Sequence, residues 1–187
     1  EGARRFFQDK VKGSWSPKEV FQGSDVLILG GGDGIKHHKS AIESFIIKNH
    51  PIVIALNTQS ELSSSYVNYR IASHPVRLLA DLDAHLNLEQ PLITPFSMLP
   101  NALRDALKGK EVLDYGLNLD ETKFVFKDKW CTTPSSLVIA YALATARAGM
   151  AGNIFMAGFD GYPAGDVRNE EIQKIIHKYN ESLENSN

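Results

Sequence analysis

A short aliphatic run that leads directly into a cluster of glycines constrains this chain more than any other feature. Residues 25–34 read Asp-Val-Leu-Ile-Leu-Gly-Gly-Gly-Asp-Gly, and a run with helical periodicity follows at residues 38–49. This order predicts a buried β-strand, a tight turn and a helix. Glycine lets the backbone approach a ligand closely, and free N–H groups at the start of a helix attract anions. The pattern predicts a phosphate-binding loop, and the alternative is a turn that needs glycine for its own conformation.

The spacing of the glycines limits what this loop binds. The dinucleotide fingerprint Gly-x-Gly-x-x-Gly fails because its last position is Ile35. The next predicted strand, residues 52–56, ends at Asn57, where an enzyme that binds NAD usually carries Asp or Glu. No Gly-Lys-Ser/Thr follows, so the loop is not an ATPase-type P-loop. The predicted ligand-binding residues of the loop are Gly30, Gly31, Gly32, Asp33 and Gly34.

The composition is that of an ordinary globular protein. The 187 residues are 43% hydrophobic and carry a net charge of −2, which suits one domain with a sizeable core. Lys and Arg are scattered, which argues against a nucleic-acid partner, and no run is long enough to span a membrane. Residues 1–12 are charged and carry no signal peptide, so we expect a cytoplasmic protein. The single Cys131 excludes an internal disulfide bond.

The predicted ligand-binding domain covers residues 25–187. Residues 1–24 are a polar and aromatic lead-in that does not begin with Met, which we interpret as a linker from an upstream domain. Trp15 and Phe21 lie in this lead-in. They pack either back on the domain or on a missing neighbour, and the sequence does not choose between these alternatives.

Apolar runs alternate between two periodicities along the rest of the chain. Short continuous runs predict strands, and runs with apolar residues three and four apart predict helices. Because strands and helices alternate, the predicted fold is α/β, a three-layer sandwich with a Rossmann-like, mainly parallel sheet. The further predicted strands are 52–56, 69–73, 91–94, 111–115, 123–126 and 153–158, and the predicted helices are 38–49, 75–86, 100–107, 137–148 and 169–183.

Polar residues follow several of the predicted strands. Asn57 comes directly after residues 52–56, and we expect it to contact the ligand unless it only forms the turn. His74 follows the next strand, with Arg77 one helical turn later, and the two could bind a phosphate or carboxylate. The alternative for Arg77 is an ion pair with Asp81 four residues on. Since the exits of parallel strands share one edge of a sheet, these residues are expected to converge.

Two further candidates lie in the second half of the chain. Asp160 follows the last predicted strand and is the best placed carboxylate, although Asp-Gly is also a favoured turn. Four hydroxyl residues precede the nearly all-apolar helix 137–148, where they can cap the helix or bind a ligand. These are Thr132, Thr133, Ser135 and Ser136.

These segments together resemble known proteins. Residues 27–34, the Thr-Thr-Pro-Ser-Ser at 132–136 and the Ile-Phe-Met-Ala-Gly-Phe-Asp at 154–160 resemble bacterial sialyltransferases of the Campylobacter type. This resemblance implies a Rossmann-like fold that binds a cytidine nucleotide sugar. Over residues 26–179 the chain is also similar to the domain that follows the barrel in 4-hydroxy-2-oxovalerate aldolase-like (HMG-CoA-lyase-type) proteins of bacterial surface-polysaccharide gene clusters. That resemblance implies an upstream aldolase domain in the same chain.

Two departures from the sialyltransferase pattern matter. That family reads Gly-x-Gly-Pro-Ser at the turn, whereas this chain has Asp33 and Gly34 in place of Pro-Ser. A carboxylate repels a phosphate unless a cation such as Mg²⁺ bridges them or the carboxylate turns toward a sugar or base. The family also carries its catalytic histidine shortly before the hydroxyl-rich segment, and residues 123–131 contain none. General-base catalysis by that route is therefore in doubt.

Three functions follow from these patterns. The first is a domain that binds a nucleotide, nucleotide sugar or phosphosugar and serves an aldolase (lyase) barrel, which needs about 250 residues and is absent here. The second is a sialyltransferase-like glycosyltransferase with Asp160 or His74 as base. The third is a non-catalytic docking or dimerisation domain, which would make a homo-oligomer. We expect a small phosphorylated ligand and assign no metal-binding residues.

Overall fold

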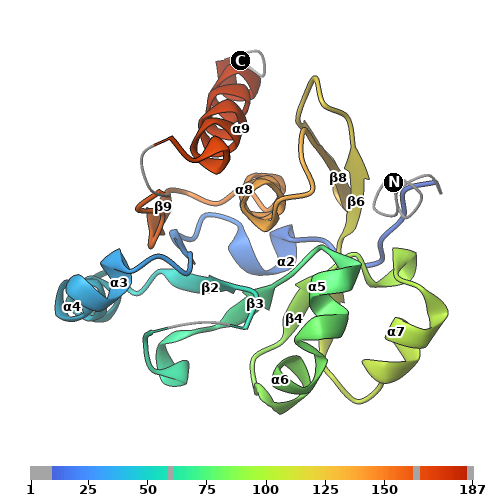
Figure 1. Ribbon diagram of the computed structural model, residues 1–187, viewed down its shortest axis with the longest axis horizontal. Coiled ribbons are helices and arrows are strands. Elements are labelled where there is room, and N and C mark those ends of the chain that lie inside the picture. The colour runs from blue at the N-terminus through green and yellow to red at the C-terminus, as the bar shows by residue number, and fades with distance from the viewer. Residues whose placement is uncertain (1–9, 59–60, 162–164, 185–187) are drawn as a thin grey trace.

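A six-stranded parallel sheet forms the centre of the molecule (Figure 1). The computed structural model describes residues 10–58, 61–161 and 165–184. The strands lie in the order β5-β4-β3-β2-β1-β9, and each neighbouring pair is parallel. Their bounds are β1 Val26–Leu29, β2 Ile52–Leu56, β3 Tyr69–Ile71, β4 Leu92–Thr94, β5 Val112–Asp114 and β9 Ile154–Ala157.

Helices cover both faces of this sheet because its central strands are apolar on both sides. In β1, Val26 and Ile28 belong to the same buried cluster as the residues of α8 (Val138–Ala148). Leu27 and Leu29 belong to a separate cluster on the other face. The first face holds α2 (Lys18–Phe21), α8 (Val138–Ala148) and α9 (Val167–Glu184). The opposite face holds α3 (Gly34–His37), α4 (Lys39–Asn49), α5 (Pro75–Ala80), α6 (Leu82–Asn87) and α7 (Asn101–Ala106). The predicted three-layer, Rossmann-like α/β fold is confirmed.

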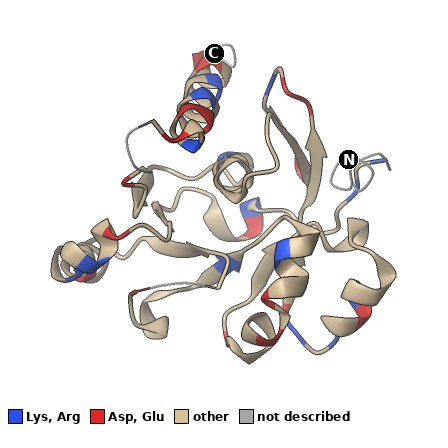
Figure 2. Ribbon diagram, viewed as in Figure 1, with Lys and Arg blue, Asp and Glu red and all other residues tan. Residues whose placement is uncertain are grey.

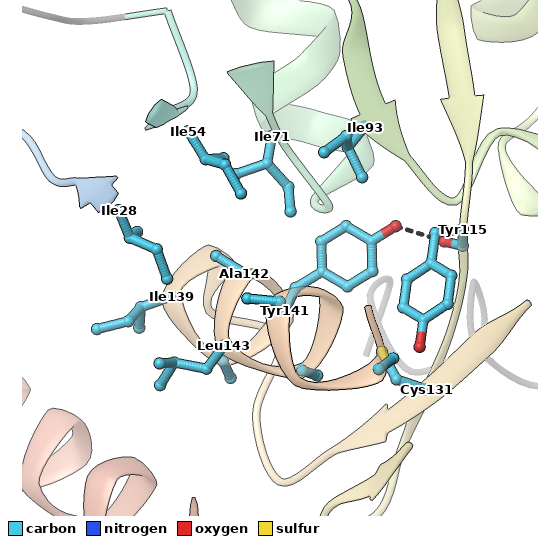
Figure 3. Close-up of a cluster of buried hydrophobic side chains, with 14 of the residues drawn as sticks. Ile28, Ile54, Ile71, Ile93, Tyr115, Cys131, Ile139, Tyr141, Ala142 and Leu143 are labelled. Atoms are coloured by element: carbon cyan, nitrogen blue, oxygen red, sulfur yellow. Dashed lines mark hydrogen bonds between the residues drawn. The ribbon is translucent and has the colours of Figure 1, made fainter. Parts of the chain in front are cut away.

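The helix α8 is the centre of the larger core. Figure 3 shows Ile28, Ile54, Ile71 and Ile93, one from each of four neighbouring strands, in a row that faces α8. Tyr141 on this helix is fully buried, and its hydroxyl donates a hydrogen bond to the backbone oxygen of Tyr115. Since a helix that is apolar on all sides belongs in a core, the sequence predicted this burial correctly.

A second, three-stranded sheet lies beside the first. It consists of β6 (Gly116–Leu119), β8 (Trp130–Thr133) and β7 (Val125–Phe126) in that order. A strand was predicted at residues 123–126, and β7 lies there, but its placement in the main sheet was wrong. The strands β6 and β8 were not predicted. Tyr115 alone separates β5 from β6, so the chain leaves the main sheet without a turn. The polar residues Asn118, Thr132 and Thr133 break the aliphatic pattern by which strands were recognised.

Two short 3₁₀ helices and several shifted ends complete the chain. The 3₁₀ helices are η1 (Ser64–Tyr66) and η2 (Phe96–Met98). The single helix predicted at 75–86 is two helices, because the chain turns at Asp81, whose φ and ψ of −104° and 19° are not helical. Among the described residues, no helix has the length and apolarity needed to cross a membrane. Basic and acidic residues are spread over the helices and loops at the periphery of the molecule (Figure 2).

The described part of the lead-in packs onto the domain. The Trp15 ring meets Phe21 and Tyr115 edge to face, with centroids 6.1 and 6.5 Å apart, and Phe21 is fully buried. Phe21 in turn contacts Tyr69 at the start of β3. Of the two alternatives left open by the sequence, these aromatic residues therefore take the first and belong to the main core.

Candidate functional site

The order of the strands places a reversal of chain direction beside β1. From β1 the chain winds outward through β2, β3, β4 and β5, and it returns as β9 on the other side of β1. In open α/β sheets a crevice forms at such a switch point, outside the carboxyl ends of the strands, and ligands bind there. We therefore expect a ligand-binding site between the loops that follow β1 and β9.

A cavity of about 320 Å³ lies at this switch point. Its lining comes from the loops after β1 and β9, the end of β2, the helix α5, the start of α8 and the helix α9. Arg77 and Asp160 are the lining residues that carry formal charge in the described part of the chain. The lining residues are 30–32, Leu56, Asn57, Arg77, 137–139, 158–161 and Ile172.

The backbone amides of the glycine loop are partly occupied by the chain that leaves β9. The N–H of Gly30 donates to the carbonyl of Ala157 at 2.8 Å, and the N–H of Gly32 donates to the carbonyl of Gly158 at 3.0 Å. The N–H of Gly34 donates to the Asp160 carboxylate at 2.5 Å. Three of the amides on which a phosphate would depend are thus already hydrogen-bonded.

The glycines make room for these contacts. A Cβ at Gly30 would clash with the carbonyl oxygen of Gly158, and a Cβ at Gly32 or Gly34 would clash with the carboxylate of Asp160. Gly158 itself has a φ of 76°, a conformation that L side chains rarely adopt. The glycine cluster therefore has a clear structural role, which is the close packing of the β1 and β9 loops.

Asn57 sits at the end of β2 and lines the cavity. Its φ is 55°, in the left-handed region that asparagine tolerates better than most residues, and its backbone N–H donates to the carbonyl of Ile71 at 2.9 Å. Its side-chain amide has no hydrogen-bond partner among the described residues. The backbone thus explains why Asn ends this strand, and the amide remains available to a ligand.

Arg77 reaches the cavity from α5. Its Nε donates to the Asp81 carboxylate at 2.6 Å, the ion pair expected four residues apart, and Thr58 contacts the same carboxylate at 3.5 Å. The two interpretations of Arg77, an ion pair and a ligand contact, are compatible. The ion pair uses Nε, so the two terminal guanidinium nitrogens, Nη1 and Nη2, can still bind a ligand. Arg77 is thus both held in place and exposed to the cavity.

Two other predicted residues lie near the cavity without lining it. Asp33 is exposed, pairs with Lys36 at 3.4 Å and is not among the lining residues. His74 is the N-cap residue of α5 and is not a lining residue; β3 ends at Ile71, so His74 does not directly follow the strand as the sequence predicted. The proposed role of Asp33 in ligand binding and that of His74 as a base stay predictions. No group of three or more potential metal ligands occurs in the described residues.

The hydroxyl residues serve the turn between β8 and α8. The sequence placed all four hydroxyls at the entrance of α8, but Thr132 and Thr133 are buried in the strand β8. Thr132 accepts from the Asn118 amide at 3.3 Å. Thr133 donates to the carbonyl of Ser135 at 2.8 Å. The Ser135 hydroxyl bonds the N–H of Leu137 and the carboxylate of Glu171, and the carbonyl of Ser136 accepts from Ser73. These contacts favour capping and turn formation over ligand binding.

The apolar residues that line the cavity were not predicted from the sequence. Val138 and Ile139 come from the start of α8, Phe159 follows β9 with its ring against Gly30, and Ile172 comes from α9. Cys131 is not a lining residue: it is fully buried in the main core, and burial raises the pKa of its thiol. Phe159 could have been suspected from its place beside Asp160, whereas Ile172 carries no local signal apart from its helix.

Comparison with known proteins adds a fold and no family. No family model matches this chain, and no curated protein matches it. A solved structure, the MAf glycosyltransferase from Magnetospirillum magneticum AMB-1, is similar with a TM-score of 0.59 and 15% sequence identity. The alignment covers 88% of this chain and 27% of that protein, so this chain corresponds to about a quarter of the glycosyltransferase. The chain therefore has the Rossmann-like fold of one part of that protein.

Proposed function

We propose that this domain binds a nucleotide sugar in the switch-point cavity and is a glycosyltransferase-like domain. The observation that carries the proposal is the cavity itself, which lies at the ligand-binding edge of the sheet and joins one basic and one acidic side chain to apolar walls. The fold shared with part of the MAf glycosyltransferase supports the same class of ligand. The aldolase association has no support from the comparisons and stays a prediction.

The charges favour a ligand with a single phosphate group. Arg77 is the one basic side chain among the described lining residues, and it already shares its charge with Asp81. A diphosphate carries more negative charge and is usually neutralised by a divalent cation or by several basic groups. A nucleoside monophosphate linked to a sugar, such as the cytidine nucleotide sugar expected from the sialyltransferase resemblance, matches one arginine better.

A second function is favoured by the lack of a suitable general base. Among the described lining residues, Asp160 is the one group that could accept a proton, and its carboxylate already accepts the N–H of Gly34. General-base catalysis prefers a group whose pKa is near the working pH, for which histidine is the usual choice. The domain would then bind the nucleotide sugar for another part of a longer protein without turning it over.

A ligand screen tests the proposal. Thermal unfolding is measured with the mono- and diphosphates of cytidine, uridine, guanosine and adenosine, with and without Mg²⁺. A ligand at a hundred times its Kd stabilises the folded state by about 2.7 kcal/mol, which raises Tm by several degrees. We expect a shift with one monophosphate, no stronger shift with the diphosphate, and loss of the shift in Arg77→Ala.

The matched control is Lys36→Ala. Lys36 is a basic residue close to the glycine loop in sequence, it pairs with Asp33 and Glu61, and it does not line the cavity. This variant should keep the shift. The absence of a shift with every nucleotide would reject the proposed function. Release of CMP from CMP-N-acetylneuraminate then separates a transferase from a binding module, since only the transferase cleaves the donor.

A further inference from the structure

Asp160 occupies the position in which a Rossmann-like loop usually presents its amides to a phosphate. The carboxylate Oδ2 accepts the N–H of Gly34, and the two neighbouring glycines at 30 and 32 donate to backbone carbonyls of the β9 exit. The lack of side chains at Gly32 and Gly34 is what allows the carboxylate to approach. The loop is thus built around an acidic side chain of the same protein.

This arrangement makes the glycine end of the cavity unsuitable for an anion. A phosphate placed there would lie beside Asp160, and Asp33 adds a second negative charge on the outer side of the loop, where Lys36 pairs with it. The described residues that line this end, Gly30, Gly31, Gly32 and Gly158, bring no cation. Like charges repel strongly where water is partly excluded.

The cation of the cavity lies at its other end. Along the carboxyl edge of the sheet the order is β3, β2, β1 and β9, and Arg77 belongs to the helix after β3 whereas Asp160 follows β9. The Arg77 Nε donates to Asp81, and this ion pair restrains the guanidinium of a residue that lines the cavity. Neighbouring strands lie about 4.8 Å apart, so the two charged groups arise from points roughly 14 Å apart.

We propose that the ligand binds with its ring hydroxyls against Asp160 and its phosphate against Arg77, which reverses the usual orientation at a glycine loop. This inference rests on the proposed function. The Asp160 Oδ1 has no described hydrogen-bond partner and Oδ2 has one, so the carboxylate can accept hydroxyl donors with both oxygens. Asp160 is then the residue that selects a hydroxylated ring, either the ribose or the transferred sugar.

Binding of matched nucleotides tests this orientation. Affinities of the four ribonucleoside 5′-monophosphates and their 2′,3′-dideoxy forms are measured by calorimetry for the full chain. In the wild type we expect the ribo form to bind at least about tenfold more tightly, because a charge-assisted hydrogen bond is lost in the dideoxy form. The same preference should fall to within about twofold in Asp160→Ala, and Arg77→Ala should weaken both forms equally.

Two variants guard against indirect effects. Asp160→Asn keeps an oxygen that can accept the N–H of Gly34, so it tests the charge if Asp160→Ala disturbs the loop. Asp33→Asn removes an acidic side chain from the same loop outside the cavity and should leave the preference unchanged. The affinities of CMP-N-acetylneuraminate and CMP are compared in the same variants. If the ribose preference persists in the Asp160 variants but tighter binding of CMP-N-acetylneuraminate than of CMP is lost, the hydroxyls that bind Asp160 come from the transferred sugar. The proposed orientation then still holds.

Other results overturn the inference. Equal strengthening of the ribo and dideoxy forms in Asp160→Ala would place the phosphate beside the glycine loop. Unchanged affinities and preferences in both Asp160 variants would remove Asp160 from the binding site while leaving the proposed function intact. A wild-type protein that binds no nucleotide would reject the proposed function together with this orientation.

Discussion

Two groups of polar residues lie at strand ends in this protein, and they differ in how far their hydrogen bonds are satisfied. At the end of β5, Asp114 is 6% exposed and accepts hydrogen bonds from the hydroxyls of Ser14 and Ser97 and from the N–H of Ser97. At the ends of β2 and β9, Asn57 and Asp160 face a cavity, and the Asn57 amide has no described partner. The first group ties the lead-in to the core, whereas the second leaves polar atoms available.

The contrast separates structural from functional polar residues better than position in the sequence does. Both groups lie at the carboxyl ends of strands of the main sheet, and position along the chain alone does not separate them. A buried carboxylate with all its oxygens occupied stabilises the fold, and its loss leaves donors unpaired. A carboxylate with a free oxygen at a cavity can bind a ligand, so its substitution should change affinity more than stability.

The largest effect is expected at the buried group. Asp114→Ala leaves the hydroxyls of Ser14 and Ser97 and the N–H of Ser97 without the buried carboxylate that accepts from them, and we expect the free energy of unfolding to fall by about 3 kcal/mol. Urea denaturation at pH 7 measures it. Asp105→Ala is the control, because Asp105 is 64% exposed and forms a surface ion pair with Lys108, and it should cost less than about 0.5 kcal/mol. Equal losses of unfolding free energy in the two variants would show that the buried hydrogen bonds of Asp114 add no more stability than a surface ion pair.

A pH titration sharpens the comparison at a third buried polar residue. His85 on α6 is 1% exposed, neither ring nitrogen has a hydrogen-bond partner among the described residues, and burial lowers its pKa from 6.5 to about 4. Between these values the unfolded chain binds more protons, so stability is present above pH 6.5 and is lost as pH falls toward 4. The full loss corresponds to about 3 kcal/mol.

This pH dependence is measured by urea denaturation at pH 7 and pH 4.5. We expect His85→Leu to lose most of the difference in unfolding free energy between the two conditions. His177→Gln is the control, since the side chain of His177 is 75% exposed, and it should behave as the wild type does. A His85→Leu variant with an unchanged pH dependence would show that other groups dominate acid unfolding.

A double-mutant cycle tests the contact between the glycine loop and Asp160. Gly34→Ala should cost about 2 kcal/mol of stability, because the new Cβ overlaps the Asp160 carboxylate. In the Asp160→Ala background the cost should vanish, and alanine can even stabilise the start of α3. Gly30→Ala is the comparison, since its clash is with the backbone of Gly158, and its cost should persist in both backgrounds.

The smallest change in stability is expected at Arg77. The ion pair with Asp81 is on the surface, where the Arg77 side chain is 51% exposed, so Arg77→Ala should change the free energy of unfolding by less than about 0.5 kcal/mol. The same variant should lose tenfold or more in affinity for a nucleoside monophosphate. Arg77→Lys should recover only part of it, because lysine lacks the planar fork. A large loss of stability with unchanged affinity would make Arg77 a structural residue.

Much of the fold and part of the candidate site could be predicted from the sequence. The continuous aliphatic runs at Val26–Leu29 and Ile52–Leu56 identified the central strands, since a strand buried on both faces needs no polar residue. Of the residues proposed at strand exits, Asn57, Arg77 and Asp160 do meet in one cavity. The hydroxyls of Thr132 and Thr133 do not, because β8 pairs with β6 in a sheet that the aliphatic pattern did not indicate.

The sequence by itself determined the alternation of strands and helices, because side-chain periodicity acts within a few residues. Only the tertiary structure decided how the glycine loop is used. The hydrogen bond from Gly34 to Asp160 joins residues 126 positions apart, and it exists because β9 packs directly against β1. Short-range patterns carry no record of such a neighbour, since the pairing of distant strands depends on the packing of the whole core.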